Sequence, residues 1–323
     1  RTNDGAFELW DGSLESFANG ELRYEVKDNI RGKDVFVIQC CDDPTEKSRS
    51  INDNITEVEL ALYTLRHNGR PGNLTAILPL FPYSRADRPD PEKRNTTSLK
   101  WFAQKLSYVG KNNIIMTDLH SPIGLNAFPD DHYHDNLSVF PIIVDYARNN
   151  YDNLKNLAII SPDVGGAVRA RRVSKYLGSR AAIGDKQKAS PGEIDDVFLM
   201  GRVRGLNALV VDDMYDSLGT SDSVARKLKE KGAASVRLYA THGIFTGKAM
   251  ERMEKLYSDG IIDKIVVSDT VPNNLNYPFL EKISIAPMLA QAIFRINRNM
   301  SVSDMLKDPD VTLYRPLSFY NQP

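Results

Sequence analysis

Short runs of apolar and β-branched residues recur along the chain, and they limit its possible folds more than any other feature. The runs cover residues 35–39, 74–81, 113–119, 157–163, 208–213, 236–242 and 264–270. Strands that are apolar on both faces are typical of parallel sheets covered by helices. Amphipathic stretches such as residues 54–69 and 221–232 separate the runs. This alternation predicts an α/β protein with doubly wound sheets.

The chain is longer than a single domain usually is. Its 323 residues favour two domains, since domains commonly hold roughly 150 residues. The segment FPDDHYHDN interrupts the strand and helix pattern near residues 130–140. We therefore assign residues 1–138 to a first domain and residues 139–295 to a second.

Composition excludes several classes of partner. A net charge of −1 gives no electrostatic reason to expect nucleic acid or an anionic membrane surface. No apolar run approaches the length of a membrane span, and the N-terminus shows no signal-peptide pattern. The two cysteines, Cys40 and Cys41, are adjacent, so we expect reduced thiols and a cytoplasmic protein.

Polar side chains follow most of the apolar runs. The segments are PYSRADR, DLH, SPDVGG, DDMYDSLGT, THGIFTG and SDT. Ligands of open α/β sheets bind beyond the carboxyl ends of the strands. The clustering favours an enzyme that handles phosphate and metal over a pure binding module.

The segment DDMYDSLGTSDS places three acids before a turn that leads into a helix. Asp212, Asp213 and Asp216 could accept hydrogen bonds from the hydroxyls of a sugar, and a helix N-terminus favours phosphate. A ribose with its 5-phosphate in the loop fits this layout. The alternative is an acidic N-cap on a surface turn.

His120 and Asp163 each follow a predicted strand, so the two could meet across a cleft and hold a divalent cation. A lone histidine is more often structural. His132 and His134 could also imitate a metal site, but loop histidines are the simpler interpretation.

Three segments offer cations for phosphate. Arg169, Arg171 and Arg172 follow the glycines of SPDVGG, and Arg85 and Arg88 flank Asp87 in another loop. Lys186 and Lys188 precede ASPGE, a composition suited to a mobile loop that could stabilise a transferring phosphoryl group. Solvated surface charge is the alternative for all three.

Taken together, these motifs resemble the ribose-phosphate pyrophosphokinase (phosphoribosyl pyrophosphate synthetase) family over nearly the whole chain. FANGE is similar to the family's FSDGE, FPYSRADR to FPYARQDR, and SPDVGGAVRAR is almost the family's segment. VVDDMYDSLGT resembles the ribose-5-phosphate motif VDDMIDTGGT, and ATHGIFTG resembles ATHGILSG. Motifs this numerous and in this order are highly specific.

The resemblance implies two phosphoribosyltransferase-like domains and Mg²⁺-dependent transfer of the pyrophosphoryl group of ATP to the 1-hydroxyl of ribose 5-phosphate, releasing AMP. It implies dimers or hexamers, with residues 296–323 packing back on the first domain. The implied sugar residues are Asp212, Asp213 and Asp216, and the implied 5-phosphate residues are Ser217, Leu218, Gly219 and Thr220. The implied ATP residues are Arg85, Asp87 and Arg88, with Phe17, Asn19 and Glu21 from a neighbouring subunit. His120 and Asp163 match Mg²⁺ positions, and Lys186 and Lys188 match the basic flexible loop; the catalytic set is Lys186, Lys188 and His120.

Several positions depart from the family pattern. Leu218 replaces a glycine of the phosphate loop, where a side chain disfavours a positive φ and is expected to reshape or open the phosphate pocket. Asn19 replaces a carboxylate, Ala86 replaces a glutamine and Lys188 replaces an arginine. Residues 40–50 are longer than the corresponding family segment, a difference that bears on allosteric control by phosphate and nucleotides. These changes leave three alternatives: the same chemistry on a 5-substituted ribose such as ADP-ribose, a catalytically silent subunit of a complex, and a base-using phosphoribosyltransferase.

Overall fold

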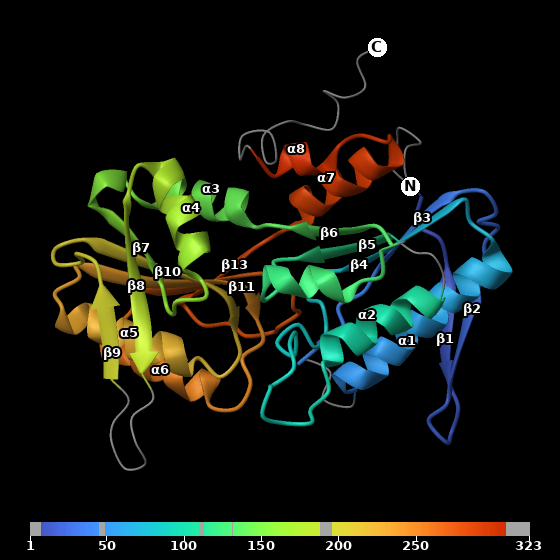
Figure 1. Ribbon diagram of the computed structural model, residues 1–323, viewed down its shortest axis with the longest axis horizontal. Coiled ribbons are helices and arrows are strands. Elements are labelled where there is room, and N and C mark those ends of the chain that lie inside the picture. Colours follow the sequence, from blue (N-terminus) through green and yellow to red (C-terminus); the bar gives the residue numbers. More distant parts are fainter. Residues whose placement is uncertain (1–7, 45–48, 110–112, 131, 188–195, 308–323) are drawn as a thin grey trace. The chain divides into compact units, whose positions relative to one another are not determined.

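The computed structural model describes residues 8–44, 49–109, 113–130, 132–187 and 196–307 (Figure 1). The chain forms two compact units, Arg1–Leu137 and Ser138–Pro323. The predicted α/β class is confirmed, because each unit holds a mainly parallel sheet flanked by helices. None of the helices in the described ranges is both long and apolar enough to cross a membrane.

The first unit is built on a parallel sheet with the strand order β3-β4-β5-β6. Its strands are β3 (Asp34–Ile38), β4 (Asn73–Leu78), β5 (Asn113–Thr117) and β6 (His134–Leu137). Its helical segments are α1 (Ile51–Thr64), the π-helical turn η1 (Leu65–Gly69), α2 (Ser98–Val109) and the 3₁₀ turn η2 (Pro122–Ala127). An antiparallel hairpin of β1 (Gly12–Ser16) and β2 (Leu22–Val26) precedes the sheet.

The second unit contains a seven-stranded sheet with the order β13-β12-β11-β10-β7-β8-β9, in which β9 alone runs antiparallel to its neighbour. Its strands are β7 (Leu157–Ser161), β8 (Arg180–Gln187), β9 (Asp196–Met200), β10 (Asn207–Tyr215), β11 (Ser235–Gly243), β12 (Lys264–Ser268) and β13 (Leu280–Ile283). Its helices are α3 (Phe140–Asn150), η3 (Leu154–Asn156), α4 (Ala167–Leu177), α5 (Gly219–Glu230), α6 (Ala249–Ser258), α7 (Ala286–Asn297) and α8 (Val302–Met305).

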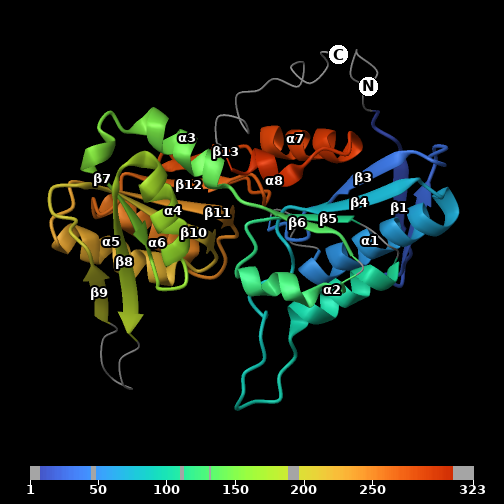
Figure 2. The same ribbon diagram turned by 45° about the horizontal axis from the view of Figure 1, so that its top comes forward.

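Helices cover both faces of this sheet. α3 and α4 lie over one face, and α5 and α6 lie over the other (Figures 1 and 2). α5 buries Ser221, Val224, Ala225 and Leu228, a spacing that places them on one stripe against the sheet. The strand β10 lies between β7 and β11, so its side chains on both faces are covered and its carboxyl end opens near the middle of the sheet edge.

The predicted domain division at residues 138 and 139 lies beside the division between the two compact units. Packing of residues 296–323 on the first domain stays a prediction, and residues 308–323 of that segment lie outside the described ranges.

Candidate active site

The acids of the DDMYD motif lie at the carboxyl end of β10 in the second unit. Asp212 pairs in register with Ala240 of β11. The backbone N–H of Asp213 donates to Oδ1 of Asp212 at 2.9 Å, and Nη1 of Arg169 lies 3.8 Å from Oδ1 of Asp213. Because Arg169 comes from α4, a helix on one face of the sheet, it supplies a cation beside the carboxylate pair.

The environment of this pair favours the protonated form of one carboxyl group. Burial raises the pKa of Asp212 well above its usual value, and the neighbouring charge of Asp213 raises it further, while Arg169 acts in the opposite direction. A cation or hydroxyl donors from a ligand would relieve this repulsion. The pair is therefore prepared for a polar ligand at the strand end.

The third acid is held by the loop that follows β11. Oδ1 of Asp216 accepts a hydrogen bond from the hydroxyl of Thr246, and the carbonyl of Asp216 accepts from the backbone N–H of Thr246 at 3.0 Å. A guanidinium nitrogen of Arg252, on α6, donates to the carbonyl of Ser217. The segment 244–252 thus fixes the turn from the side of α6.

Leu218 corrects the expectation that its side chain reshapes the phosphate loop. The residue has φ 63° and ψ 7°, the left-handed conformation that glycine adopts easily, and it immediately precedes α5. Only 4% of the residue is exposed, and it belongs to the hydrophobic cluster that includes Val224 and Met253. The isobutyl group therefore lies in the core, and the backbone keeps a conformation typical of glycine at this position.

The start of α5 is well suited to an anion. Leu218, the N-cap residue, provides no side-chain hydrogen bond to the helix, so the first N–H groups lack the usual cap. Gly219 and Thr220 are partly exposed and Ser217 is exposed. Backbone N–H groups and the helix dipole at this point attract negative charge, and hydroxyl groups add donors.

The neighbouring loop after β7 is organised differently. Oδ1 of Asp163 accepts a hydrogen bond from the backbone N–H of Gly166 at 2.8 Å, and the Ser161 hydroxyl donates to the carbonyl of Asp163. A β-carbon on Gly166 would lie 2.6 Å from the Ser161 hydroxyl oxygen, so the turn requires glycine here. Asp163 thereby closes the turn before α4 with one oxygen while its side chain is exposed, and the N-cap residue Gly166 gives the helix no side-chain hydrogen bond.

The arginines of α4 divide between different roles. Arg169 faces Asp213, as described above. Arg172 lies over the ring of Phe140 at 4.1 Å and donates to the carbonyl of Leu306 at 2.9 Å, so its guanidinium fixes packing among helices of the second unit. This corrects its interpretation as a phosphate clamp. For Arg171, the structure gives no side-chain contact within the described ranges that would test its predicted role in phosphate binding.

In the first unit, His120 is exposed just beyond β5, where the sequence places it. It follows Asp118, which is buried with φ 41°, and the N–H of Leu119 donates to Oδ1 of Asn136 at 2.9 Å. This hydrogen bond ties the DLH segment to β6 and directs the backbone that carries His120.

The loop after β4 carries Arg85, Asp87 and Arg88. Arg85 and Arg88 are exposed, and Nε of Arg88 lies 3.4 Å from Oδ1 of Asp87. The Asp87 side chain is only 5% exposed, and its Oδ2 has no hydrogen-bond partner among the described residues. Tyr83, with φ 59°, turns the chain into this loop. A buried acceptor without a partner fits a loop that is completed by a ligand.

Phe17, Asn19 and Glu21 lie together at the exposed turn of the β1–β2 hairpin. The N–H of Phe17 donates to the carbonyl of Glu21 at 2.8 Å, and the N–H of Glu21 donates to Oδ1 of Asn19 at 3.2 Å. Arg23 lies over the ring of Phe17 at 5.8 Å. The turn presents these side chains outward from the sheet.

Residues able to hold Mg²⁺ are present in both units. The described ranges contain no group of three or more histidine, cysteine or acidic side chains arranged around one ion. Mg²⁺ usually keeps several waters and takes one or two protein carboxylates together with substrate phosphates. The exposed carboxylate of Asp163 fits that requirement, whereas Mg²⁺ binding by the exposed His120, whose imidazole offers no oxygen ligand, stays a prediction.

His132 and His134 make contacts within the first unit. Nδ1 of His134 lies 3.3 Å from the carbonyl of His132, and the His134 ring stacks on Phe128 at 4.7 Å. His134 is also the first residue of β6, not part of a loop.

The segment that contains Lys186 and Lys188 begins in β8. Lys186 lies in β8 with its backbone paired to Val197 of β9, and Lys188 lies outside the described residues. The catalytic assignment of both lysines stays a prediction.

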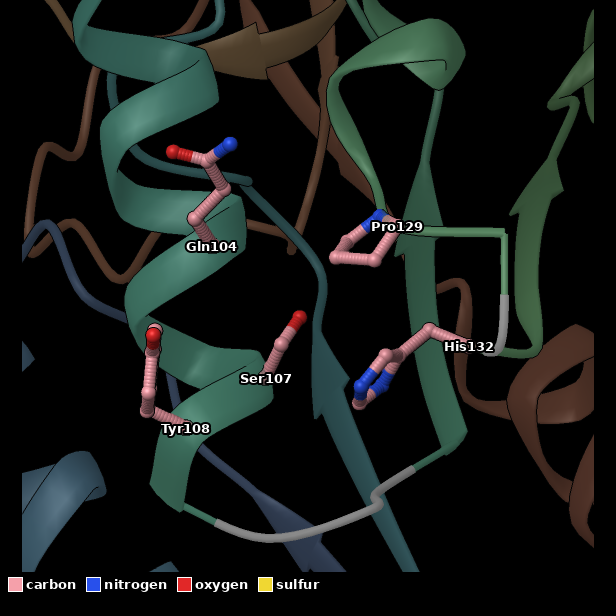
Figure 3. A pocket seen from close by; sticks show the side chains of 5 residues that line it. All are labelled: Gln104, Ser107, Tyr108, Pro129 and His132. Carbon is pink, nitrogen blue, oxygen red and sulfur yellow. The ribbon is translucent and has the colours of Figure 1, made fainter.

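A surface pocket of about 380 Å³ lies in the first unit. Its lining is Gln104, Ser107, Tyr108, Pro129 and His132, with α2 on one side and the segment before β6 on the other (Figure 3). None of the predicted site residues lines it.

Sequence patterns did not single out Thr246 or Arg252. Both belong to the site through contacts with residues 30 and 35 positions earlier in the chain. The segment THGIFTG marked the region, but nothing in its pattern indicated that the threonine holds Asp216.

Two family models match the chain. One is described as the N-terminal domain of ribose phosphate pyrophosphokinase and matches residues 4–110. The other is described as the phosphoribosyl synthetase-associated domain and matches residues 178–307. Each model falls mainly on one of the two units.

Known relatives agree with these models. A ribose-phosphate pyrophosphokinase of Aquifex aeolicus is 35% identical over 300 residues, 92% of this chain and 91% of the relative. One from Buchnera aphidicola is 36% identical over 303 residues, with coverage of 93% and 91%. The crystal structure of phosphoribosylpyrophosphate synthetase from Mycobacterium smegmatis covers 90% of this chain and 92% of its own, with a TM-score of 0.79 and 27% identity. The resemblance found from the motifs is confirmed.

Proposed function

Because the chain belongs to the ribose-phosphate pyrophosphokinase family, we propose that it transfers the pyrophosphoryl group of ATP to the 1-hydroxyl of ribose 5-phosphate and releases AMP. One observation carries the proposal for the acceptor. The acids at the end of β10 stand directly before an α5 N-terminus whose cap residue provides no side-chain hydrogen bond. A sugar and its 5-phosphate need this pairing of acceptors and donors.

The acids would orient the sugar. Asp212, Asp213 and Asp216 accept hydrogen bonds from ribose hydroxyls, and the turn from Ser217 to Thr220 receives the 5-phosphate through its N–H and hydroxyl groups. Thr246 keeps Asp216 in place, since it donates to that carboxylate. Such fixed acceptors accelerate transfer chiefly by positioning.

The other residues would act on ATP. His120 and Asp163 are the residues that would hold Mg²⁺, which would neutralise charge on the triphosphate. Arg85, Asp87 and Arg88 contact the nucleotide, and Lys186 and Lys188 stabilise charge as AMP departs. Phe17, Asn19 and Glu21 reach the adenine of a neighbouring subunit, which requires a homo-oligomer, a dimer or a hexamer. We place the protein in the cytoplasm, as expected from two cysteines that are thiols rather than a disulfide.

Leu218 no longer argues for a larger acceptor such as ADP-ribose. That alternative depended on an isobutyl group opening the phosphate loop, and this group lies in the core. Ribose 5-phosphate is therefore the acceptor that we propose.

The test is AMP production from ATP by the purified full chain. We expect AMP only when ribose 5-phosphate and Mg²⁺ are both present, and a chelator should abolish it. Absence of AMP with ribose 5-phosphate, across Mg²⁺ concentrations that keep the protein folded, would contradict the proposal and favour a silent subunit.

A further inference from the structure

Arg252 brings a cation to the phosphate loop from outside the sequence motif. It is a half-buried residue of α6 whose guanidinium donates to the Ser217 carbonyl. A β-carbon built on Gly219 would lie 3.5 Å from Nη1 of Arg252 and 3.8 Å from Oγ of Ser217. The open side of Gly219 is therefore bordered by a guanidinium and a hydroxyl group.

The charge of Arg252 has no carboxylate partner within the described ranges, which sets it apart from its neighbours. Arg226, on the adjacent helix α5, is paired with both Asp222 at 2.9 Å and Asp259 at 3.0 Å. A guanidinium has five N–H donors, and the Ser217 carbonyl engages only one nitrogen. Donors and a full charge therefore remain at the loop.

We propose that Arg252 makes this site selective for a terminal, doubly charged phosphate on C5 of the sugar over a phosphodiester. The inference rests on the proposed function and names the charge state of its acceptor. A phosphate monoester carries up to two charges near neutral pH, whereas a diester carries one, so an unneutralised guanidinium favours the monoester. A diester also places an ester carbon where the monoester offers an oxygen acceptor.

The buried side chain of Leu218 strengthens this selectivity. It holds the turn from within the core while Arg252 and Thr246 hold it from α6 and its preceding loop. A loop fixed from both sides cannot widen cheaply for a larger substituent, because the interior is close-packed. Charge and rigidity therefore favour the same acceptor.

Two variants compare an uncharged with a charged side chain at position 252. Arg252→Gln has amide donors but is shorter and has no charge, and Arg252→Lys keeps the charge. For ribose 5-phosphate we expect Arg252→Gln to raise KM about 10-fold or more, with kcat and the KM for ATP nearly unchanged. Arg252→Lys should recover most of the loss, and the control Arg226→Gln should leave the KM unchanged.

The decisive readout is the preference for ribose 5-phosphate over its methyl phosphodiester, measured as the ratio of the two kcat/KM values. Arg252→Gln should lower this ratio about 10-fold. An unchanged ratio, or an equal loss in the Gln and Lys variants, would overturn the inference and leave Arg252 as a packing residue.

A second measurement keeps this inference separate from the proposed function. Inorganic phosphate should raise the melting temperature of the wild-type protein and of Arg252→Lys, but much less that of Arg252→Gln. If no acceptor yields AMP, the proposed function fails, while this difference still supports a phosphate site at Arg252. If AMP forms but phosphate protects all the variants equally, only the inference fails.

Discussion

Two loops at adjacent strand ends of the second unit enter a helix with different side chains in the turn. After β7, the chain uses its own Asp163 to satisfy the N–H of Gly166 at the start of α4. After β10, the residue before α5 is Leu218, whose side chain lies in the core and offers the helix no hydrogen bond. Each loop leads from a buried parallel strand into a helix, so their topology is the same.

The difference indicates where an external anion belongs. Neither helix has a side-chain cap, but the N–H of the residue before α4 already donates to a carboxylate of the chain, whereas no such acidic side chain accepts from the residues at the start of α5 in the described ranges. The N–H groups at α5 are therefore the better suited to a phosphate. The carboxylate at α4 then has one oxygen for a cation, and the loop at α5 has N–H groups for an anion. The proposed cation and anion sites differ in which side chain occupies the turn.

The largest expected effect concerns Leu218, the buried residue that precedes α5. Leu218→Ala should lower the free energy of unfolding by about 2–5 kcal/mol, because it removes buried methyl groups. Leu218→Gly should be at least as stable as Leu218→Ala, because glycine adopts a positive φ without the cost of roughly 1–2 kcal/mol that a β-carbon incurs. Urea denaturation measures both.

Leu228 of the same helix is the matched control, since it is fully buried in α5. There the glycine variant should be less stable than the alanine variant by about 1 kcal/mol. If the Leu218 pair showed that same order, its left-handed conformation would be contradicted.

The next largest effect concerns the proposed contact between Asp216 and the sugar. Asp216→Ala should raise the KM for ribose 5-phosphate about 10- to 100-fold, since one hydrogen bond to a charged group contributes about 1.5–3 kcal/mol. Steady-state kinetics with Asp259→Ala as the control would measure it. Unchanged sugar kinetics would remove Asp216 from the site.

A smaller effect tests the loop after β7. Asp163→Ala should cost about 1 kcal/mol of stability, the usual contribution of one hydrogen bond. Asp163→Asn should retain that stability, because an amide oxygen can still accept from Gly166, but it should raise the Mg²⁺ concentration needed for activity. A stable Asn variant with normal Mg²⁺ dependence would leave Asp163 with a structural role alone.

The smallest expected effect is a gain in stability. The pKa of Asp212 is raised in the folded protein, so the stability that this group contributes is present below its unfolded pKa of about 3.9 and is lost as pH rises through the raised value. Asp212→Asn should therefore raise the melting temperature at pH 8 by about 2–4 °C, the shift that ~1 kcal/mol gives a unit of this size. The gain should shrink toward pH 4, while sugar binding falls at all pH values. A lower melting temperature at pH 8 would contradict the assignment.

The sequence predicted the central strands well because they are continuous apolar runs buried on both faces. It did not indicate β6 or β13, whose short sequences HDNL and LEKI contain polar residues and gain their strand conformation from pairing with a neighbour. The helix predicted for residues 54–69 begins earlier, at Ile51, where Ser50 and Asp53 form a capping box. It also ends earlier as an α-helix and continues as a π-helical turn.

Site prediction from sequence was limited in a different way. The acids of β10 are adjacent in the chain, so their shared position at a strand end could be predicted. Thr246 and Arg252 join them only through the pairing of β10 with β11 and the packing of α5 against α6. The side chain of Leu218 points into the core because the residue has a positive φ. A leucine in the sequence indicates a negative φ, so residue type alone gave the wrong direction.

The most direct test follows the label from ATP carrying a radioactive β-phosphate, with ribose 5-phosphate and ADP-ribose as acceptors in parallel reactions of the full chain. The account predicts that the label moves to ribose 5-phosphate in amounts equal to the AMP formed, and far more slowly to ADP-ribose. Label that stays in ATP with both acceptors, or that moves preferentially to ADP-ribose, would contradict it.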